Sequence, residues 1–303
     1  MFIIKHKKIF LAISAVLVLV SIILLSTLGL RLSIDFKGGA LAEVSYPNGR
    51  PESAQISEAL KLNNIGEVIV QVTGDKGYII KTKDLTEAER IALFKALSLG
   101  GSYQVEEKSF NSIGPSIGTE LRRKAIVSLS AVILAIILFI AYAFRKVSKP
   151  VSSWKYGIIA IVTLLHDVAI PIGLFTILSY YSHVEVDTLF VVAVLTILGL
   201  SVSDTIVVFD RVRENIKNRL SDDFKETVGR SLEQVYTRSI NTSLTVILVL
   251  LSLFFFGPQS TKYFALMLSA GMFFGTYSSI FLASPLLVLV QEWQDRKSGK
   301  FIK

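Results

Sequence analysis

The sequence contains no cysteine, and only 18% of its 303 residues are charged. The absence of cysteine excludes disulfide bonds, zinc–thiolate sites and a thiol nucleophile. A soluble domain of this length would carry about a quarter charged residues, whereas 51% of the residues here are hydrophobic. The composition therefore indicates a protein of the lipid bilayer.

Two common catalytic motifs are also missing. The sequence has neither a Gly-x-x-x-x-Gly-Lys-[Ser/Thr] phosphate loop nor a His-Glu-x-x-His zinc pair, and it contains only three histidines. Nucleotide hydrolysis and metalloprotease chemistry therefore have no visible site, and we expect neither an enzyme nor a bound cofactor or metal. Energy for any work would come from an ion gradient or from a partner protein.

Long apolar runs are frequent. A helix needs about 20 apolar residues to span the bilayer, and five runs fit this length: Ile9 to Leu30, Ala125 to Phe144, Gly157 to Leu178, Thr188 to Phe209 and Phe264 to Val290. A sixth run, Leu244 to Phe256, is long enough only if it is extended back to Ser239. It is followed by Gly257 and Pro258, which predict a turn into the last span.

The first run has an alternative interpretation as a cleaved signal peptide, because Ala40-Leu41-Ala42 resembles a cleavage site. The apolar run is longer than the usual 7–15 residues, however, and the triplet lies well beyond its end. A retained membrane anchor is the preferred interpretation.

The net charge of +8 could reflect nucleic acid binding, but the positions of the basic residues indicate membrane orientation instead. Lysine and arginine prefer cytoplasmic loops, and six spans with both termini in the cytoplasm place 17 basic and 8 acidic residues on that side. The opposite short loops contain only Lys262, with Glu185 and Asp187. We therefore predict a multi-pass membrane protein with no nucleic acid partner.

The segment after the first span has a mixed, charged pattern and would lie outside. It predicts strands at Leu41 to Tyr46, Val68 to Thr73, Tyr78 to Lys83 and Tyr103 to Lys108, with helices at Glu52 to Leu62 and Thr86 to Leu97. Gly74 to Gly77 favours a hairpin, and Thr86 with Glu89 resembles a capping box. This order of elements is typical of a ferredoxin-like split βαβ arrangement. Without histidine or a nucleophile paired with a base, it indicates a contact domain.

The predicted fold class is thus a polytopic α-helical membrane protein with six transmembrane helices and an external α+β ferredoxin-like domain between helices 1 and 2. The predicted divisions are residues 1–30 (N-terminus and first helix), 31–120 (external domain), 121–292 (helices 2 to 6) and 293–303 (basic cytoplasmic tail).

Three ionisable residues fall inside the predicted spans: Asp167, Asp204 and Arg238. A charge in hydrocarbon costs several kcal/mol unless it is paired, so each is first treated as functional. At 1.5 Å per residue, Asp204 lies about 8 Å from the cytoplasmic end of its helix, and Arg238 lies at a similar depth on the next helix. We therefore expect these two side chains to meet.

Such a pair would act as a proton-coupled switch, because desolvation favours the neutral acid whereas a nearby guanidinium favours the anion. Small and hydroxyl residues near Asp204 would permit close helix packing or give a polar lining: Gly199, Ser201, Ser203 and Thr205. The alternative is a static ion pair that fixes the register of the two helices.

Asp167 has two interpretations, proton carriage or a structural hydrogen bond between helices. The adjacent His166 need not form a relay with it, because neighbouring helical residues point in different directions, and we interpret it as a packed polar residue. The external His183, Glu185 and Asp187 could bind metal, but a solvated loop is preferred.

Four stretches together resemble the SecF family of bacterial protein translocase subunits. They are Asp35-Phe36-Lys37-Gly38-Gly39, Ile113 to Gly118, His166-Asp167, and Gly199 to Asn215 with its core Asp204-Thr205-Ile206-Val207-Val208-Phe209-Asp210-Arg211. The resemblance covers nearly the whole chain. The sequence departs from the family pattern at Leu200, where an aromatic residue is usual, and at Ser203, where asparagine is usual.

The resemblance implies a subunit of the SecDF complex, related to RND transporters, in the bacterial cytoplasmic membrane. It implies a SecD-like partner, the SecYEG channel with SecA, and contact with the translocating polypeptide and with membrane lipid. The family's membrane aspartate and arginine correspond to Asp204 and Arg238, through which the proton-motive force would assist late steps of export. The alternatives are a passive scaffold for translocase components and half of an RND-type small-molecule exporter.

Overall fold

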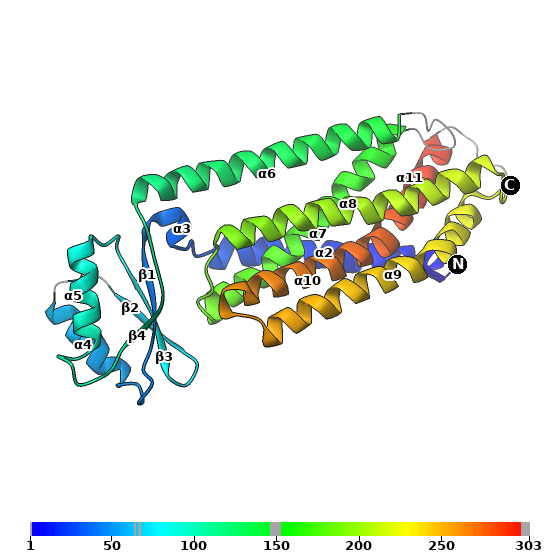
Figure 1. Ribbon diagram of the computed structural model, residues 1–303. Helices are drawn as coiled ribbons and strands as arrows, with labels where there is room; N and C mark the ends of the chain where they lie inside the picture. Colours follow the sequence, from blue (N-terminus) through cyan, green and yellow to red (C-terminus); the bar gives the residue numbers. More distant parts are fainter. Residues whose placement is uncertain (1, 64, 66–67, 146–152, 298–303) are drawn as a thin grey trace. The chain divides into compact units, whose positions relative to one another are not determined.

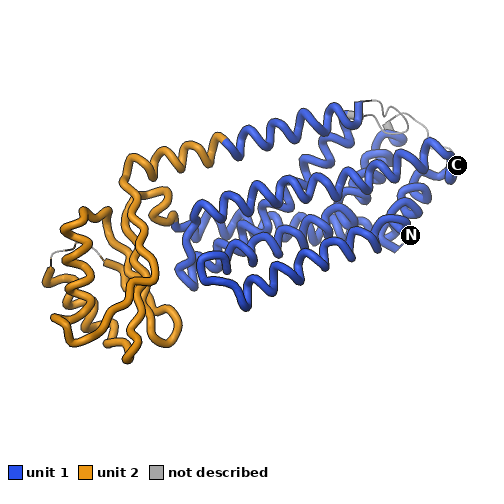
Figure 2. The backbone as a smooth tube through the Cα atoms, viewed as in Figure 1, with its two compact units in different colours: residues 1–31, 128–303 blue, residues 32–127 orange. Residues whose placement is uncertain are grey.

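The computed structural model describes residues 2–63, 65, 68–145 and 153–297. The chain divides into two compact units, residues 1–31 with 128–303 and residues 32–127, called here the helical unit and the α+β unit (Figure 2). The division falls inside one long helix, α6 (Pro115–Ala143), which belongs partly to each unit.

Six helical stretches among the described residues are long and apolar enough to cross a membrane, as predicted. The helical elements are α1 (Phe2–Lys5), α2 (Lys7–Leu28), α6, α7 (Ser153–Tyr181), α8 (Thr188–Lys217), α9 (Phe224–Phe256), α10 (Gln259–Ser278), the π-helix η1 (Ser279–Ala283) and α11 (Ser284–Lys297), and Figure 1 shows their arrangement. The predicted polytopic helical class is confirmed. The sixth span is formed by α10, η1 and α11 together.

A π-helix interrupts the last span. Pro285 lies just after η1, and its ring nitrogen has no hydrogen to donate to the carbonyl oxygen four residues earlier. The regular α-helical hydrogen-bond ladder is therefore broken at this point, and single turns of π-helix often occur at functional sites. The predicted turn between the last two spans is confirmed: α9 ends at Phe256, and Pro258 is the N-cap residue of α10.

Helices α8 and α9 continue past the predicted apolar runs. Helix α8 ends at Lys217, eight residues beyond the predicted end at Phe209, and side-chain hydrogen bonds hold this extension to α9. Arg211 Nε donates to Gln234 Oε1 (2.6 Å), and Asn215 Nδ2 donates to Ser231 Oγ (2.8 Å). Because these contacts are polar, the apolar pattern could not predict them.

The α+β unit has a four-stranded sheet with two helices on one face (Figure 1). Its elements are α3 (Ile34–Lys37), β1 (Gly39–Ser45), α4 (Ser53–Leu62), β2 (Ile69–Thr73), β3 (Gly77–Thr82), α5 (Glu87–Leu97) and β4 (Glu106–Ile113). The strand order is β2-β3-β1-β4, and all neighbouring strands are antiparallel. The predicted sequence of strands and helices is therefore observed, and Thr86 and Glu89 form the predicted capping box.

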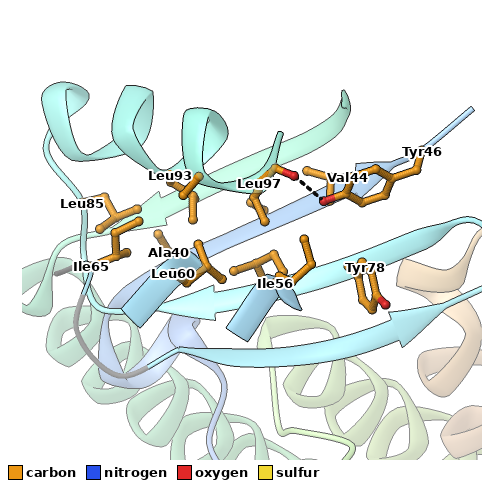
Figure 3. Packing of buried hydrophobic residues seen from close by; sticks show 13 residues of the cluster. Ala40, Val44, Tyr46, Ile56, Leu60, Ile65, Tyr78, Leu85, Leu93 and Leu97 are labelled. Carbon is orange, nitrogen blue, oxygen red and sulfur yellow. Dashed lines mark hydrogen bonds between the residues drawn. The ribbon is translucent and has the colours of Figure 1, made fainter. Parts of the chain in front are cut away.

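The core of the α+β unit lies between the sheet and its two helices (Figure 3). Leu60 of α4 and Leu93 of α5 are fully buried against the sheet, and burial of such a side chain contributes about 1.5–3 kcal/mol. The hydroxyl of Tyr46 donates to the carbonyl oxygen of Leu97 (3.1 Å), which ties the end of α5 to the sheet. Helix α5 therefore has both an apolar and a polar attachment.

The prediction for the last strand was wrong in position. Strand β4 begins three residues later than predicted and ends at Ile113 instead of Lys108, because Gly39 of β1 pairs with Ile113. Tyr103 precedes the strand and packs edge-on against Tyr46. Most residues of β4 are exposed or only partly buried, so its sequence lacks the alternation that marks a half-buried strand.

The Gly-Gly stretch has a structural explanation. Gly38 (φ +80°) and Gly39 (φ +139°) have backbone conformations that side chains rarely permit. A Cβ on Gly38 would lie 2.9 Å from the Pro115 Cα, and one on Gly118 would lie 2.8 Å from the Gly38 backbone nitrogen. Two of the sequence stretches used for the resemblance therefore contact each other at the start of α6. Phe36, which precedes them, is buried.

Candidate functional site

Asp167 of α7 is the most enclosed charged residue of the helical unit. Its side chain is fully buried and receives three hydrogen bonds, from His166, Ser201 of α8 and Ser278 of α10. The His166 Nδ1–Asp167 Oδ1 distance is 2.8 Å, and Ser278 Oγ donates to Asp167 Oδ2 at 2.6 Å. This carboxyl group therefore joins three helices.

His166 contacts Asp167 although neighbouring residues of a helix point in different directions. The ring is 2% exposed and stacks on Tyr277, with ring centroids 5.9 Å apart. Its Nε2 atom is buried and has no hydrogen-bond partner in the described structure. His166 is thus both a packed residue, as predicted, and a partner of the carboxyl group.

Asp204 lies on α8 and is partly buried. Its Oδ2 atom accepts a hydrogen bond from Thr276 Oγ1 of α10 (3.3 Å). Thr276 Oγ1 also makes a hydrogen bond with Ser243 Oγ of α9. One hydroxyl group therefore lies between the carboxyl group of α8 and the neighbouring helix α9.

The two carboxyl groups are connected through a single stretch of α10. Thr276 binds Asp204, and Ser278, two residues later, binds Asp167. Ser279, the first residue of the π-helix, donates to the Thr276 carbonyl oxygen (3.0 Å). We call Thr276, Ser278 and Ser279 the hydroxyl segment. Hydroxyl groups both donate and accept, so this segment can respond to the protonation of either acid.

Glycines of α10 let α8 approach closely enough to form these contacts. A Cβ on Gly271 would lie 2.2 Å from Ile197 Cγ1, and one on Gly275 would lie 3.6 Å from the Ser201 Cβ. Small residues four positions apart are typical of closely packed membrane helices. The close approach of α8 to α10 therefore depends on Gly271, whereas a Cβ at Gly275 would make only ordinary contact.

The structure does not bring Arg238 to Asp204. The Arg238 side chain is exposed on α9, and no ion pair between it and Asp204 occurs in the part of the chain that the structure describes. The buried face of α9 runs instead through Val235, Ser239 and Ser243. Helical depth predicted only a shared level, whereas the direction of each side chain depends on rotation of the helix about its axis.

The other predicted residues of α8 lie on two faces. Ser201 and Thr205 are buried and point into the bundle, and the Thr205 hydroxyl has no partner among the described residues. Gly199 and Ser203 are exposed, and a Cβ on Gly199 would meet no atom within 4 Å. Within the part of the chain that the structure describes, the face with Ser201 and Thr205 is therefore packed and the face with Gly199 and Ser203 is exposed.

Asp210 and Arg211 lie outside the carboxyl site. Asp210 pairs with Arg213 (2.8 Å) on the same helix, and Arg211 pairs with Glu214 (2.6 Å) besides its bond to Gln234 of α9. Of these contacts, only the one between Arg211 and Gln234 joins α8 to α9, and the other two lie within α8.

His183, which was predicted to lie outside the membrane, makes a contact within the helical unit. Arg31 Nη1 donates to His183 Nδ1 (2.7 Å), and the Asp187 side chain accepts from the Phe190 backbone N–H (2.7 Å) as the N-cap of α8. Among the described residues, no group of three or more His, Asp and Glu side chains is arranged to hold a metal ion.

Sequence reasoning missed Ser243, Thr276 and Ser278. Hydroxyl residues are common in membrane helices, so none of the three is distinctive alone. A signal was nevertheless present, since Gly271-Met272-Phe273-Phe274-Gly275 is a Gly-x-x-x-Gly motif directly before Thr276. This motif marks a helix-packing face, and polar residues adjoining it are candidates for contacts between helices.

Comparisons with known proteins identify the family of this chain. The family model described as protein export membrane protein SecD/SecF, C-terminal, matches residues 95–293, and the SecD/SecF GG motif model matches residues 23–46. The chain belongs to the SecD/SecF family. The carboxyl site lies within the first match, and Gly38 and Gly39 lie within the second.

Relatives named protein translocase subunit SecF match nearly the whole of this chain. The protein from Thermobaculum terrenum is 41% identical, with 97% of this chain and 94% of that protein covered. The protein from Haemophilus influenzae is 33% identical, with 92% of this chain and 82% of that protein covered. The resemblance in the sequence motifs is therefore confirmed at the level of the family.

Solved structures of SecDF have the same fold. The crystal structure of SecDF from Thermus thermophilus, described as a translocon-associated membrane protein, is 29% identical with a TM-score of 0.81 over 95% of this chain. SecDF in a super-membrane-facing form is 30% identical with a TM-score of 0.65 over 98% of the chain. This chain spans 38% and 39% of those two SecDF chains.

Proposed function

We propose that this protein is a SecF-like subunit that uses the proton-motive force to assist late steps of protein export. It works in the bacterial cytoplasmic membrane with a SecD-like subunit, beside the SecYEG channel and SecA, and it contacts the translocating polypeptide. Membership of a family described as protein export membrane proteins supports the export role. The contacts of the two membrane carboxyl groups support the coupling to protons.

The observation that carries the proposal is the attachment of both carboxyl groups to one segment. Asp204 and Asp167 bind hydroxyls two residues apart on α10, directly before the π-helix. A hydrogen bond to a carboxylate is roughly twice as strong as one between neutral groups. Protonation of Asp204 weakens its hydrogen bond with Thr276, so that the Thr276 hydroxyl keeps only its hydrogen bond with Ser243. The contacts among α8, α9 and α10 therefore change together.

The energy available is sufficient for such a change. One elementary charge crossing 100 mV supplies about 2.3 kcal/mol. Hydrogen bonds between membrane helices average about 0.6 kcal/mol and reach about 1.7 kcal/mol. A single proton can therefore outweigh the Thr276–Asp204 bond.

Arg238 has a role in this proposal because it is not paired with Asp204 in the observed arrangement. A static ion pair that fixes register needs the two side chains in contact, whereas a switch forms and breaks this contact. We assign the Asp204–Arg238 pair to a second arrangement of the helices. Asp167 remains bound to Ser201 and Ser278 and relays the change to α7.

The exposed face of α8 is assigned to the SecD-like subunit. Gly199 and Ser203 are exposed among the described residues, and small residues permit close approach of a second helix. The SecDF chains of known structure are more than twice as long as the part matched here, which supports a separate SecD-like chain as the occupant.

The α+β unit is assigned to the external side and to the ferredoxin-like class. Its strand order β2-β3-β1-β4 with antiparallel neighbours and two helices on one face supports that class. Both termini are assigned to the cytoplasm from the distribution of basic residues. The sheet face opposite α4 and α5 is then available to an emerging polypeptide.

The test is export of a secreted protein into inverted membrane vesicles that contain this chain and a SecD-like subunit. We expect Asp204→Asn to insert and to bind its partner normally but to abolish the part of export that depends on the proton gradient. Asp222→Asn, an exposed aspartate of the α8–α9 loop, is the matched control and should export normally.

A passive scaffold would retain its effect after an uncoupler collapses the gradient, and a small-molecule exporter would show efflux without any secreted protein. Gradient-dependent export by Asp204→Asn at the wild-type level would overturn the proposed mechanism.

A further inference from the structure

Three lysines, Lys5, Lys7 and Lys225, form a cluster beside the N-terminal helix α1 of the helical unit. Lys7 of α2 and Lys225 of α9 both pair with Glu292 of α11, at 2.5 Å and 2.9 Å. Lys5 of α1 makes no hydrogen bond or ion pair with any described residue. These three lysines and Asp223 line one cleft of about 470 Å³, so three of its four charged residues are basic.

The cluster lies at the depth where tryptophans mark a membrane surface. Trp293 directly follows Glu292, and Lys155 Nζ lies 5.6 Å from the Trp154 ring and 5.9 Å from the Trp293 ring. Both tryptophans are exposed, and they are the only two in the chain. Exposed tryptophans concentrate at the level of lipid headgroups, so the lysine cluster is at that level.

An apolar groove of about 460 Å³ adjoins the basic cleft, and both share Phe2 and Ile4. The groove follows α9 from Gly229 to Ile240, which is about 16 Å at 1.5 Å per residue. Its remaining lining is apolar or aromatic except for Glu233, whose side chain is exposed. Ile280 and Phe281 of the π-helix also line it.

We propose that the basic cleft and the groove together bind one acidic phospholipid. The phosphate of the headgroup lies on Lys5, with Lys7 and Lys225 nearby, and one acyl chain lies in the groove along α9. Charge complementarity favours an anionic headgroup, and the apolar groove beside it favours a lipid over a soluble anion. Basic pockets between membrane helices are known to hold acidic lipid headgroups.

This site has a structural consequence. The acyl chain would contact Ile280 and Phe281, and the π-helix that contains them begins with Ser279 of the hydroxyl segment. A bound lipid therefore packs against the element that follows the carboxyl site. The lipid site requires only that the protein is inserted in a membrane. Failure of the proton-coupling test would therefore leave the lipid proposal unaffected.

The test is native mass spectrometry of the full chain with its SecD-like partner in detergent micelles. The probes are palmitoyl-oleoyl phosphatidylglycerol, phosphatidylcholine with the same chains, and inorganic phosphate. Lys5→Gln removes the unpaired lysine, Lys8→Gln removes an exposed lysine outside the cleft, and Ile240→Trp fills the groove at a position that is 43% exposed.

We expect phosphatidylglycerol to bind several-fold more tightly than phosphatidylcholine. A lysine near an anionic lipid contributes about 1 kcal/mol, so Lys5→Gln should weaken binding about fivefold, whereas Lys8→Gln should change it less than twofold. Ile240→Trp should also weaken lipid binding.

Three results would overturn the proposal. They are equal binding of the two lipids, equal effects of the two lysine substitutions, and binding of inorganic phosphate together with unchanged lipid binding in Ile240→Trp. The proposal would also be refuted if Lys5 were required for binding another protein while neither lipid bound at the cleft. That result would identify the cleft as a protein docking site.

Discussion

The spacing of α8 and α10 is open to a sharp test, because two glycines one turn apart meet different surroundings. A Cβ at Gly271 would lie 2.2 Å from Ile197 Cγ1, a distance that forces one of the helices or the Ile197 side chain to move. A Cβ at Gly275 would lie 3.6 Å from the Ser201 Cβ, which is ordinary contact. A glycine-to-alanine substitution therefore tests the packing at Gly271, and the same substitution at Gly275 is its control.

The magnitude follows from two opposing terms. Overpacking costs about 1–3 kcal/mol, and replacing a helical glycine by alanine gains up to about 1 kcal/mol. We expect Gly271→Ala to lower the free energy of unfolding by about 1–2 kcal/mol. Gly275→Ala should leave it unchanged or raise it by up to about 1 kcal/mol.

The assay is equilibrium unfolding of the full chain in mixed micelles of a mild detergent and sodium dodecyl sulfate, followed by tryptophan fluorescence. Ile197→Ala removes the atoms that clash, so the loss caused by Gly271→Ala should disappear in that background. Equal stabilities of the two glycine variants, or a loss at Gly271 that persists without the Ile197 side chain, would refute this account of helix spacing.

Two further outcomes are expected in the α+β unit. Gly38→Ala meets both a positive φ and the Pro115 backbone, whereas Gly49→Ala meets a positive φ (+101°) with no atom within 4 Å. Protease resistance of the unit should therefore fall more in the first variant, and equal losses would exclude a role for the contact with α6. The hydrogen bond from Lys83 chiefly lowers the pKa of Glu89 from 4.5 to about 2. Because this pKa is lower in the folded state, the contribution of Glu89 is present above pH 4.5 and is lost as the pH falls toward 2. The protection factors of the amides at the start of α5, which are corrected for the intrinsic pH dependence of hydrogen exchange, should fall over that range in the wild type. They should show no such fall in Glu89→Gln, and identical profiles would contradict the assignment.

The spans, the four strands and helices α4 and α5 could be predicted because they depend on local patterns, whereas α3 and the π-helix η1 were not predicted. Apolar length indicated five of the six candidate spans found among the described residues, and the turn at Gly257 and Pro258 supported the sixth. The capping box at Thr86 located the start of α5 within one residue. The polar ends of α8 and α9 were missed because Arg211 and Asn215 hold them together by side-chain hydrogen bonds. Strand β4 was misplaced because its register is determined by pairing with β1.

The carboxyl site could be predicted only in part. Asp167 and Asp204 stand out because charges are rare in apolar spans. Their partners depend on which faces of the helices meet, and at Gly271 that meeting relies on close packing that the apolar pattern does not reveal. For the same reason depth alone suggested a contact between Asp204 and Arg238 that the observed helix arrangement does not contain.

The central claim is that protonation of Asp204 couples an ion gradient to the helical unit. Its most direct test is ion flux into vesicles that contain this chain and a SecD-like subunit, measured separately with a proton gradient and with a sodium gradient. The account predicts flux driven by the proton gradient that is lost in Asp204→Asn and retained in Asp222→Asn. Undiminished proton flux in Asp204→Asn, or flux driven only by the sodium gradient, would contradict it.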